Sequence, residues 1–543
     1  MTRLTSTLTR IRWILTTLIN SGFLALLRPD RYVRMGISLW RSGGPSPISG
    51  LGLAAAQYPG HPAVIDEAGT LTWGELDERA DALGVGLYGL TIAPPTTVAI
   101  MCRNHRGLIE ALAATSRIGA DAVLLNTGFA GPQLADVLAR EQAEILVADD
   151  EFAGLVEQAR ACLPDLKVVW SWQEEKGLVA GPGTAEQLVQ RHRGGRPDRP
   201  SRPGRIILLT SGTTGTPKGA KRGGGADVGS LAALLDRIPW RAGEPVVVAA
   251  PIFHAWGFGQ VAIGATMHAT LVMRRRFDPE ATLDLVRRHG ATGLAVVPVM
   301  LERIMDLPSA TLDAKPMPTL RFVTASGSRM RADALIGFTG RFGDVVYNSY
   351  NATEAGLIST ATPADLRIAP DTAGRPLTGT TVRILDDELA PLPTGAIGKI
   401  AVTSSSGFDG YTSDDAKDYA DGLMISGDLG RFDERGLLYV VGRDDEMIVS
   451  GGENVYPQEV EQALDEHPGV SEVAVIGVDD QRFGQRLVAY VVRSDVSLTA
   501  AQLREHVKAR LAGYKVPRDV HFLEALPRNA TGKILKRELT PGG

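Results

Sequence analysis

The chain has only two cysteines, Cys102 and Cys162, among its 543 residues. Two are too few for a disulfide framework, and they lack the paired spacing of a metal site, so we expect a reducing cytosol. We expect each cysteine to be a small buried apolar residue rather than a nucleophile. The net charge of −5 gives no reason to expect nucleic acid as the main partner. No internal repeat or heptad pattern is present.

Acidic residues are missing from the N-terminus. Residues 1–29 contain none, whereas Arg3, Arg10 and Arg12 precede the uncharged stretch 13–27. This stretch carries apolar residues at helical spacing but is shorter than the ~20 residues that span a bilayer. No signal-peptide cleavage site follows it. Two interpretations stay open: residues 1–35 lie on an anionic membrane surface, which would make the protein peripheral on the inner face of the cell membrane, or they pack on the protein body.

The length exceeds what one hydrophobic core can hold, so two or more domains are expected. From about residue 50 to 180, strand-like runs such as 97–101 alternate with helical patterns such as 106–118. Another helical pattern begins at Thr72, with Glu75 three positions on as in a capping box. This alternation predicts an α/β fold with parallel sheets covered by helices. Residues 181–204, rich in glycine and proline, predict a surface linker. A second break near 436–446 precedes a segment long enough to form a small independent domain.

The most informative motif is TSGTTGTPKG at residues 210–219, which follows the apolar run 205–209. Glycines allow close backbone approach, hydroxyl and N–H groups donate hydrogen bonds, and a lysine adds charge, so we expect a nucleotide triphosphate here. The loop is not a Walker A motif, because Lys218 is not followed by Ser or Thr. A flexible linker is the alternative. The candidate phosphate-binding residues are Thr210, Ser211, Gly212, Thr213, Thr214, Gly215 and Lys218.

Three later segments carry further candidates: FHAWGF (253–258), ASGSRM (325–330) and YNATEAG (350–356). Glu354 in the third is a suitable Mg²⁺ ligand, because Mg²⁺ prefers one or two carboxylates together with phosphate oxygens. Thr353 beside it can donate a hydrogen bond to phosphate. The alternative for Glu354 is a carboxylate at a helix N-terminus, where the helix dipole favours negative charge.

These segments, together with SGD (426–428), GRDDEMIVSGGENVYPQEVE (442–461) and PRNATGKILK (527–536), resemble in order the signature motifs of the adenylate-forming superfamily. The resemblance covers about residues 50–540 and is nearest to fatty acyl-CoA synthetases. It implies an α/β fold whose large N-terminal domain has stacked parallel-rich sheets and a distorted β-barrel, with a small mobile α+β domain after it. The implied parts are an N-terminal segment 1–49, an adenylation domain 50–441, a hinge 442–445 and a C-terminal domain 446–543.

The resemblance also implies roles for residues of the first domain. His254 would lie near the reacting carboxylate, and Trp256 would line or gate the acyl channel. Thr353 would contact the α-phosphate, and Glu354 would bind the metal. The residues implied at the adenine and the acyl carbonyl are Gly327, Ser328, Arg329, Tyr350 and Asn351. Family members usually carry glycine where Asn351 stands, and asparagine tolerates the left-handed backbone that glycine allows.

Five residues of the second half complete the implied site. Asp428 would accept hydrogen bonds from both ribose hydroxyls, and Arg443 would contact ribose or phosphate. Asp445 occupies the hinge position. Gly451 and Gly452 would let the pantetheine arm of coenzyme A pass close to the backbone. Lys533 would bridge the substrate carboxylate and the α-phosphate, neutralising charge where two anions must meet.

The expected activity is therefore an acid–thiol ligase that uses ATP, Mg²⁺ and coenzyme A. We expect a medium- to long-chain fatty acid as substrate, because a membrane helix would face lipid and no aspartate marks a site for an amino-acid ammonium. Two alternatives remain: an acyl-AMP ligase that passes its product to a carrier protein, and a non-catalytic membrane-associated scaffold. The sequence leaves the oligomeric state open.

Overall fold

The computed structural model describes residues 2–24, 29–178, 181, 183–210, 218–223, 228–328, 330–403, 408–412, 417–446, 448–450, 453–480, 484–511, 513–529 and 532–539. The chain divides into two compact units. The first contains residues 1–380 and 404–417, and the second contains 381–403 and 418–543. The predicted hinge at 442–445 lies inside the second unit and stays a proposal.

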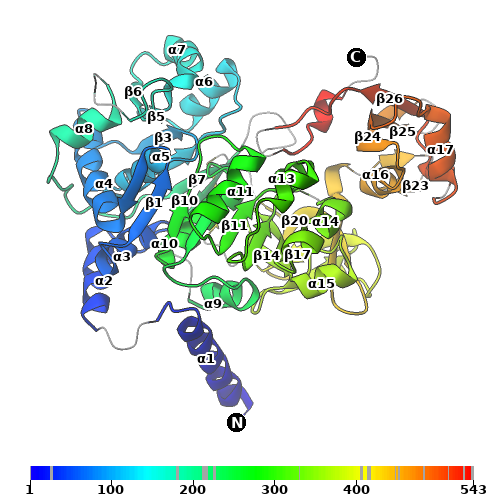
Figure 1. The fold of residues 1–543 in the computed structure, drawn as a ribbon, viewed down its shortest axis with the longest axis horizontal. Coiled ribbons are helices and arrows are strands. Elements are labelled where there is room, and N and C mark those ends of the chain that lie inside the picture. The colour runs from blue at the N-terminus through cyan, green and yellow to red at the C-terminus, as the bar shows by residue number, and fades with distance from the viewer. Residues whose placement is uncertain are drawn as a thin grey trace. The chain divides into compact units, whose positions relative to one another are not determined.

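The larger sheet of the first unit has nine strands (Figure 1). Its central strands are parallel, and antiparallel strands stand at both edges. In spatial order they are β15 (Arg375–Pro376), β14 (Gly356–Ala361), β13 (Val346–Ala352), β12 (Phe322–Ala325), β11 (Gly293–Val296), β9 (Pro245–Val248), β10 (Thr270–Val272), β1 (Pro62–Asp66) and β2 (Gly69–Thr72).

The second sheet of this unit has seven strands, of which the last five are parallel. In spatial order they are β18 (Phe408–Tyr411), β8 (Lys218–Arg222), β7 (Ile206–Thr210), β4 (Asp121–Leu124), β3 (Thr97–Met101), β5 (Ile145–Ala148) and β6 (Lys167–Trp170). The central strands are apolar at successive positions because helices cover both faces, as expected for parallel sheets.

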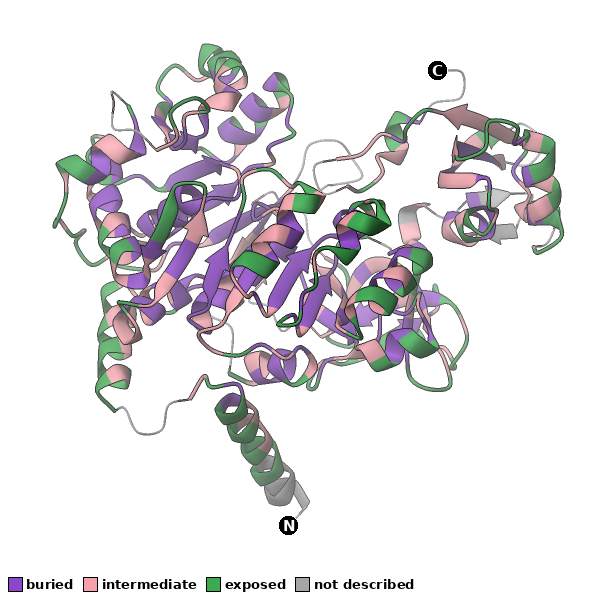
Figure 2. Ribbon diagram, viewed as in Figure 1, coloured by how far each residue is buried: buried purple, intermediate pink, exposed green. Residues whose placement is uncertain are grey.

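Most helices of the first unit bury apolar residues against these sheets, whose strands are largely purple in Figure 2. The helix Pro29–Arg41 is an exception, because it has no buried residue. Thr72 and Glu75 form the predicted capping box at the start of α4. The helices are α1 (Thr2–Asn20), α2 (Pro29–Arg41), α3 (Ser49–Gln57), α4 (Trp73–Tyr88), α5 (Arg106–Arg117), α6 (Gly131–Arg140), α7 (Ala153–Cys162), α8 (Ala185–Arg191), α9 (Val228–Arg237), α10 (Ala255–Thr266), α11 (Pro279–Arg288), α12 (Pro298–Met305), α13 (Ser309–Asp313), α14 (Ala332–Phe342) and α15 (Pro363–Ile368), with a 3₁₀ turn η1 (Asp150–Phe152).

The second unit contains two five-stranded sheets. The first is antiparallel: β16 (Val382–Leu385), β17 (Gly398–Val402), β20 (Leu423–Phe432) and β19 (Tyr419–Ala420), with β21 (Leu438–Arg443) also on β20. The second contains β23 (Glu453–Val455), β22 (Ile448–Ser450), β25 (Gly484–Arg493), β24 (Val470–Asp480) and β26 (Asp519–Leu523). Its helical elements are η2 (Asp444–Glu446), α16 (Pro457–Asp465), α17 (Ala500–Lys508), η3 (Gly513–Lys515) and η4 (Lys536–Glu538).

The predicted α/β class with a smaller α+β C-terminal part is confirmed by this architecture. Two expectations were wrong. The segment 181–204 is not only a linker, because Thr184 caps the short helix α8. Cys162 is exposed at the end of α7, whereas Cys102 is buried as expected. Among the described residues, no helix is long and apolar enough to cross a membrane.

Candidate active site

The carboxyl ends of four neighbouring strands gather the candidate residues of the first unit. Strands β13, β12, β11 and β9 stand side by side in this order and run parallel. The segment with His254 follows β9, Gly327 follows β12, and Asn351 lies near the end of β13. Ligands of open α/β sheets bind at this edge of the strands. The topology therefore places three separately predicted motifs at one sheet edge.

His254 is the N-terminal residue before α10, and its environment keeps the imidazole neutral. Its Nε2 atom is shielded from solvent and has no hydrogen-bond partner in the described part of the chain. Burial lowers the pKa of His254 to about 4. At neutral pH the side chain is therefore an uncharged group that offers either a donor or an acceptor nitrogen to a bound molecule.

Trp256, two residues after His254, has its indole ring fixed by a hydrogen bond to the sheet. Its Nε1–H donates a 2.8 Å hydrogen bond to the carbonyl oxygen of Val296, the last residue of β11. Only 7% of the residue is exposed, and it belongs to the core cluster that covers this face of the nine-stranded sheet. The ring position is thus fixed by the sheet.

The turn after β12, which contains Gly327, is hydrogen-bonded to the YNATEAG segment at the end of β13. Ser326 is fully buried, and its hydroxyl donates a 2.5 Å hydrogen bond to Oδ1 of Asn351. Gly327 has φ +106°, a backbone conformation that favours glycine. Ser328 beside it is exposed. The asparagine that replaces the family's usual glycine therefore has a defined partner in the neighbouring motif.

Glu354 lies in the turn between β13 and β14 and is 8% exposed. Strand β13 carries Tyr350 and Asn351 as strand residues. The Tyr411 hydroxyl donates a hydrogen bond to Oε1 of Glu354, and Nζ of Lys417 lies 3.7 Å from the same oxygen. The carboxylate is thus buried and already oriented, and it is not at a helix N-terminus.

Cationic side chains surround this carboxylate. Arg222, in β8, donates a hydrogen bond to the carbonyl oxygen of Thr353, and burial lowers the pKa of Arg222 while the charge of Glu354 opposes that shift. Lys218 lies over the ring of Tyr411, 5.9 Å from its centroid. Strand β18, which carries Tyr411, pairs with β8, which carries Lys218 and Arg222. This pairing brings the end of the 210–219 motif close to the turn that contains Glu354.

The predicted ATP and Mg²⁺ fit this residue set. One buried carboxylate with three nearby cations suits a metal-bound polyphosphate better than a bare cation. The Nε of Arg222 is buried without a hydrogen-bond partner in the described residues, as is Nε2 of His254. Such groups are costly unless a ligand satisfies them. Sequence reasoning missed Arg222, Tyr411 and Lys417; the alternation of Lys218 and Arg222 on one face of β8 was the available signal.

The second unit pairs Asp428 with Arg443. These residues face each other across β20 and β21, and Nη1 of Arg443 lies 3.2 Å from Oδ1 of Asp428. Asp428 also donates its backbone N–H to the Ser426 hydroxyl. The 3₁₀ turn η2 with Asp445 directly follows β21. The two predicted ribose-contacting residues are therefore neighbours.

Lys533 is exposed at the tip of a closed turn. Its backbone N–H donates a 2.8 Å hydrogen bond to Oδ1 of Asn529, and the Asn529 N–H donates to the Lys533 carbonyl at 2.9 Å. Arg528 donates to the Gly532 carbonyl at 2.6 Å. These hydrogen bonds join the described ends of the turn, and Lys533 is exposed.

Some predicted residues lie outside the described residues: Ser211, Gly212, Thr213, Thr214, Gly215, Arg329, Gly451 and Gly452. Thr210 is described as the last residue of β7, and Asp445 as a residue of η2, without their side chains.

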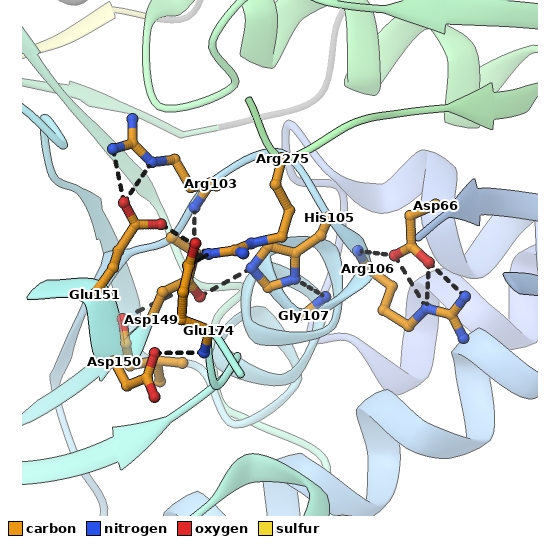
Figure 3. A network of polar contacts seen from close by, with 12 residues as sticks. Asp66, Arg103, His105, Arg106, Gly107, Asp149, Asp150, Glu151, Glu174 and Arg275 are labelled. Atoms are coloured by element: carbon orange, nitrogen blue, oxygen red, sulfur yellow. Dashed lines mark hydrogen bonds and ion pairs between the residues drawn. The ribbon is translucent and has the colours of Figure 1, made fainter. Parts of the chain in front are cut away.

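A second polar cluster in the first unit is structural (Figure 3). Cys102, His105 and Asp149 are buried close together, a grouping that could hold a metal ion. Figure 3 shows His105 and Asp149 of this group. However, His105 Nδ1 accepts from the Gly107 N–H at 3.1 Å, and its Nε2 lies 2.9 Å from Asp149 Oδ1. Burial raises the pKa of the Cys102 thiol, so the thiolate that a metal requires is disfavoured. The cluster joins the ends of β3 and β5 and caps α5.

Comparison with known proteins assigns the chain to a family. The family model described as "AMP-binding enzyme" matches residues 52–412, and that of the "AMP-binding enzyme C-terminal domain" matches residues 459–533. The chain belongs to the AMP-binding enzymes. The predicted membership of the adenylate-forming superfamily is thereby confirmed.

This AMP-binding enzyme is similar to two curated proteins and one solved structure that show the range of its relatives. An indoleacetate–CoA ligase from Aromatoleum aromaticum is 32% identical, over 89% of this chain and 96% of the relative. A fatty acid–[acyl-carrier-protein] ligase from Streptomyces coeruleorubidus is 30% identical, over 89% and 94%. The structure of o-succinylbenzoate CoA synthetase from Bacillus subtilis with its acyl-adenylate intermediate aligns with a TM-score of 0.78 and 26% identity, over 91% and 98%.

These similarities show that the protein is an adenylate-forming ligase, but they do not identify the carboxylic acid that it activates. The CoA ligases of the family use ATP, Mg²⁺ and coenzyme A. The acids in the relatives' names differ widely, so the family does not specify a fatty acid.

The neutral His254 predicts a pH dependence of stability. Because its folded pKa of about 4 lies below the ordinary value of 6.5, the unfolded chain binds the proton more tightly. Stability is therefore lost as the pH falls from about 6.5 to about 4 and is unaffected above this window. Relative to His254→Asn, the wild-type free energy of unfolding should fall by an amount on the order of 2 kcal/mol between neutral pH and pH ~4.5. Urea titrations at both pH values measure this; an unchanged difference between the two proteins contradicts it.

Proposed function

We propose that this AMP-binding enzyme activates a medium- to long-chain fatty acid with ATP and transfers the acyl group to coenzyme A. The first step joins the acid carboxylate to the α-phosphate and releases pyrophosphate. In the second, the thiol of coenzyme A attacks the acyl carbon and AMP leaves with the bonding electron pair. The observation that carries the proposal is the buried, oriented Glu354 among Lys218, Arg222 and Lys417.

Each side chain would bind or position a reactant rather than form a covalent bond with it. Glu354 would hold Mg²⁺, and the cations around it would bind the phosphate chain. Asp428 would accept from the ribose hydroxyls, and Lys533 would approach the carboxylate and α-phosphate during the first step. Catalysis would come from positioning and charge stabilisation, since the phosphoanhydride already activates the acid.

Two observations support a fatty acid as the substrate. The fatty acid–[acyl-carrier-protein] ligase is among the relatives, and an exposed apolar surface at the N-terminus suits a lipid-derived substrate. That same relative favours a second candidate, in which the acyl group passes from the adenylate to a carrier protein. A non-catalytic scaffold is the third alternative.

Release of AMP distinguishes these functions. Purified protein would be given ATP, Mg²⁺ and a panel of fatty acids and aromatic acids, with coenzyme A, with an acyl-carrier protein, or with neither. We expect AMP and acyl-CoA from fatty acids with coenzyme A. Product only with the carrier protein would favour the second candidate, and product only from aromatic acids would overturn the acid class. No AMP under any condition would favour the scaffold.

We also propose a membrane surface as a partner. Leu18 of α1 is 1% exposed and packs into the core with Trp13 and Ile14 beside it, so this helix is docked on the first unit. Its other face presents a stripe of exposed apolar residues at helical spacing. These are Leu8, Ile11, Leu15 and Ile19, exposed by 63%, 48%, 46% and 42%.

The next helix presents a similar surface. Figure 2 shows α2 largely exposed, and its exposed apolar residues are Tyr32, Val33, Ile37 and Trp40. Arginines accompany both helices, and the one acidic residue of these segments, Asp30, is paired with Arg34 at 2.7 Å. Apolar side chains beside unbalanced positive charge fit the interface of an anionic bilayer. Packing on the body and membrane contact, the two earlier alternatives, thus use different faces of α1.

Vesicle sedimentation tests this partner. We expect the full chain to sediment with vesicles containing phosphatidylglycerol and much less with pure phosphatidylcholine. The variant Ile11→Glu/Leu15→Glu leaves Leu18 in place and should weaken binding more than about tenfold, because two apolar side chains can no longer enter the interface. The matched control is Ile336→Glu/Ile368→Glu, which changes two exposed apolar residues elsewhere in the unit. Equal binding by both variants, or no binding by the wild type, would overturn the proposal.

A further inference from the structure

Lys536, three residues after Lys533, lies where several elements of the second unit come together. Lys536 begins η4, and its Nζ lies 2.8 Å from Oε1 of Glu461 and 3.5 Å from Oε2 of Glu446. The side chain of Lys536 is 20% exposed and that of Glu461 15%. Burial alone would lower the pKa of Lys536, but the two carboxylates outweigh it and raise that pKa. The lysine is therefore a buried cation with two anionic partners.

Its partners belong to different elements. Glu461 lies on α16, and its Oε1 also accepts a 2.8 Å hydrogen bond from the backbone N–H of Val475 in β24. Glu446 is the last residue of η2. Through these contacts Lys536 connects the segment after the Lys533 turn to helix α16, to strand β24 and to the 3₁₀ turn that contains Asp445.

The opposite end of the same 3₁₀ turn is held by another lysine. Lys399, in β17, lies 3.8 Å from Asp444 and 3.1 Å from Asp387. The two neighbours of Asp445 are therefore paired with lysines from two different elements of the unit, Glu446 with Lys536 of η4 and Asp444 with Lys399 of β17. Glu446 faces the segment that carries Lys533, and Asp444 faces the antiparallel sheet.

We propose that Lys536 is a positioning residue that couples the Lys533 turn to the predicted hinge, so that Glu446 and Lys533 move as one body when Asp445 rotates. The proposal rests on the proposed function, because it assigns Lys536 a role only in the step that needs Lys533. Asp444 stays with β17 in this scheme, which confines the change of backbone conformation to Asp445.

The competing explanation is that the Lys536 ion pairs only stabilise the fold. Breaking a buried ion pair destabilises a protein whatever its role, so a loss of total activity decides nothing. The two half-reactions separate the explanations. Adenylation can be followed as pyrophosphate release, and thioester formation can be followed from a supplied acyl-adenylate. A positioning role predicts an effect on the first alone.

The main variant is Lys536→Met, which keeps the aliphatic stem and removes the charge. We expect adenylation to fall about tenfold or more with thioester formation changed less than about twofold. Lys536→Arg should restore adenylation, because it keeps the charge between both glutamates. Lys515→Met is the matched control, since Lys515 is 16% exposed and pairs at 2.6 Å with Glu459, which lies on α16 as Glu461 does. Among the described residues, no ion pair joins Lys515 to the Lys533 turn. It should not change the ratio of the two half-reactions.

A double-mutant cycle with Lys533→Ala completes the test. If Lys536 acts through Lys533, Lys536→Met should cause no further loss in the Lys533→Ala background. Glu446→Gln, which leaves the Glu461 contact intact, should reproduce the selective loss if the Lys536→Met chain is too unstable to assay. Equal loss in both half-reactions, or losses that multiply with Lys533→Ala, would overturn the proposal. Failure of the proposed function would show separately, as absence of AMP from the wild-type protein.

Discussion

We expect Lys533→Ala to lower the rate of adenylation about 10²-fold to 10³-fold, the loss typical when one charge-stabilising group is removed from a reaction centre. The physical reason is that an acid carboxylate and a phosphate must approach each other, and only a cation at that point offsets their repulsion. Thioester formation from a supplied acyl-adenylate should change little, because that anion pair has already reacted. The measurements are pyrophosphate release and acyl-CoA formation under matched conditions.

Because Lys533 is exposed, we expect Lys533→Ala to remove its charge without disturbing the fold. The turn is closed by the Asn529 side chain and by backbone bonds, so removal of the lysine side chain leaves its hydrogen bonds intact. Lys508→Ala is the control, since Lys508 is exposed on α17 and forms a surface ion pair with Glu505. Equal losses in both half-reactions would contradict the assigned role.

Glu354→Gln is the second large effect that we predict. The amide has the shape of the carboxylate but no charge, so Mg²⁺ should bind more weakly and adenylation should fall about 10²-fold. Titration with Mg²⁺ should show a higher half-saturating concentration, and excess metal should restore part of the rate. This partial rescue separates a metal ligand from a residue that only supports the fold.

The control for Glu354→Gln is Glu388→Gln, an exposed carboxylate of the second unit. A thermal melt of both variants guards against misfolding, because Glu354 also neutralises buried Arg222 and pairs with Lys417. Loss of activity with an unchanged Mg²⁺ requirement would exclude Glu354 as the metal ligand.

Local patterns in the sequence predicted much of the fold. The strand 97–101 has the same bounds as β3, because five successive apolar or β-branched residues are buried on both faces of a parallel sheet. Thr72 and Glu75 identified the start of α4 through a capping box that depends only on neighbours in the chain. Helix α8 was hidden by the glycines and prolines around it, although Thr184 was available as a capping residue.

The environment of the candidate site could not be predicted in the same way. Glu354 was identified from its own segment, but its partner Tyr411 comes from a strand 57 residues later. Pairing of β18 with β8 is a long-range contact, and no local periodicity encodes it. The hydrogen bond from Ser326 to Asn351 likewise depends on the parallel order of β12 and β13.

The discontinuous first unit has a practical consequence for expressing parts of this protein. Because residues 404–417 return to that unit, a gene ending at residue 380 would omit β18. The truncated chain would leave β8 as an open edge strand, which invites aggregation through strand pairing between molecules. It would also remove Tyr411 from Glu354. Ending the gene after residue 417 would keep both the sheet edge and the contact between Tyr411 and Glu354, and the yield of soluble protein would report the difference.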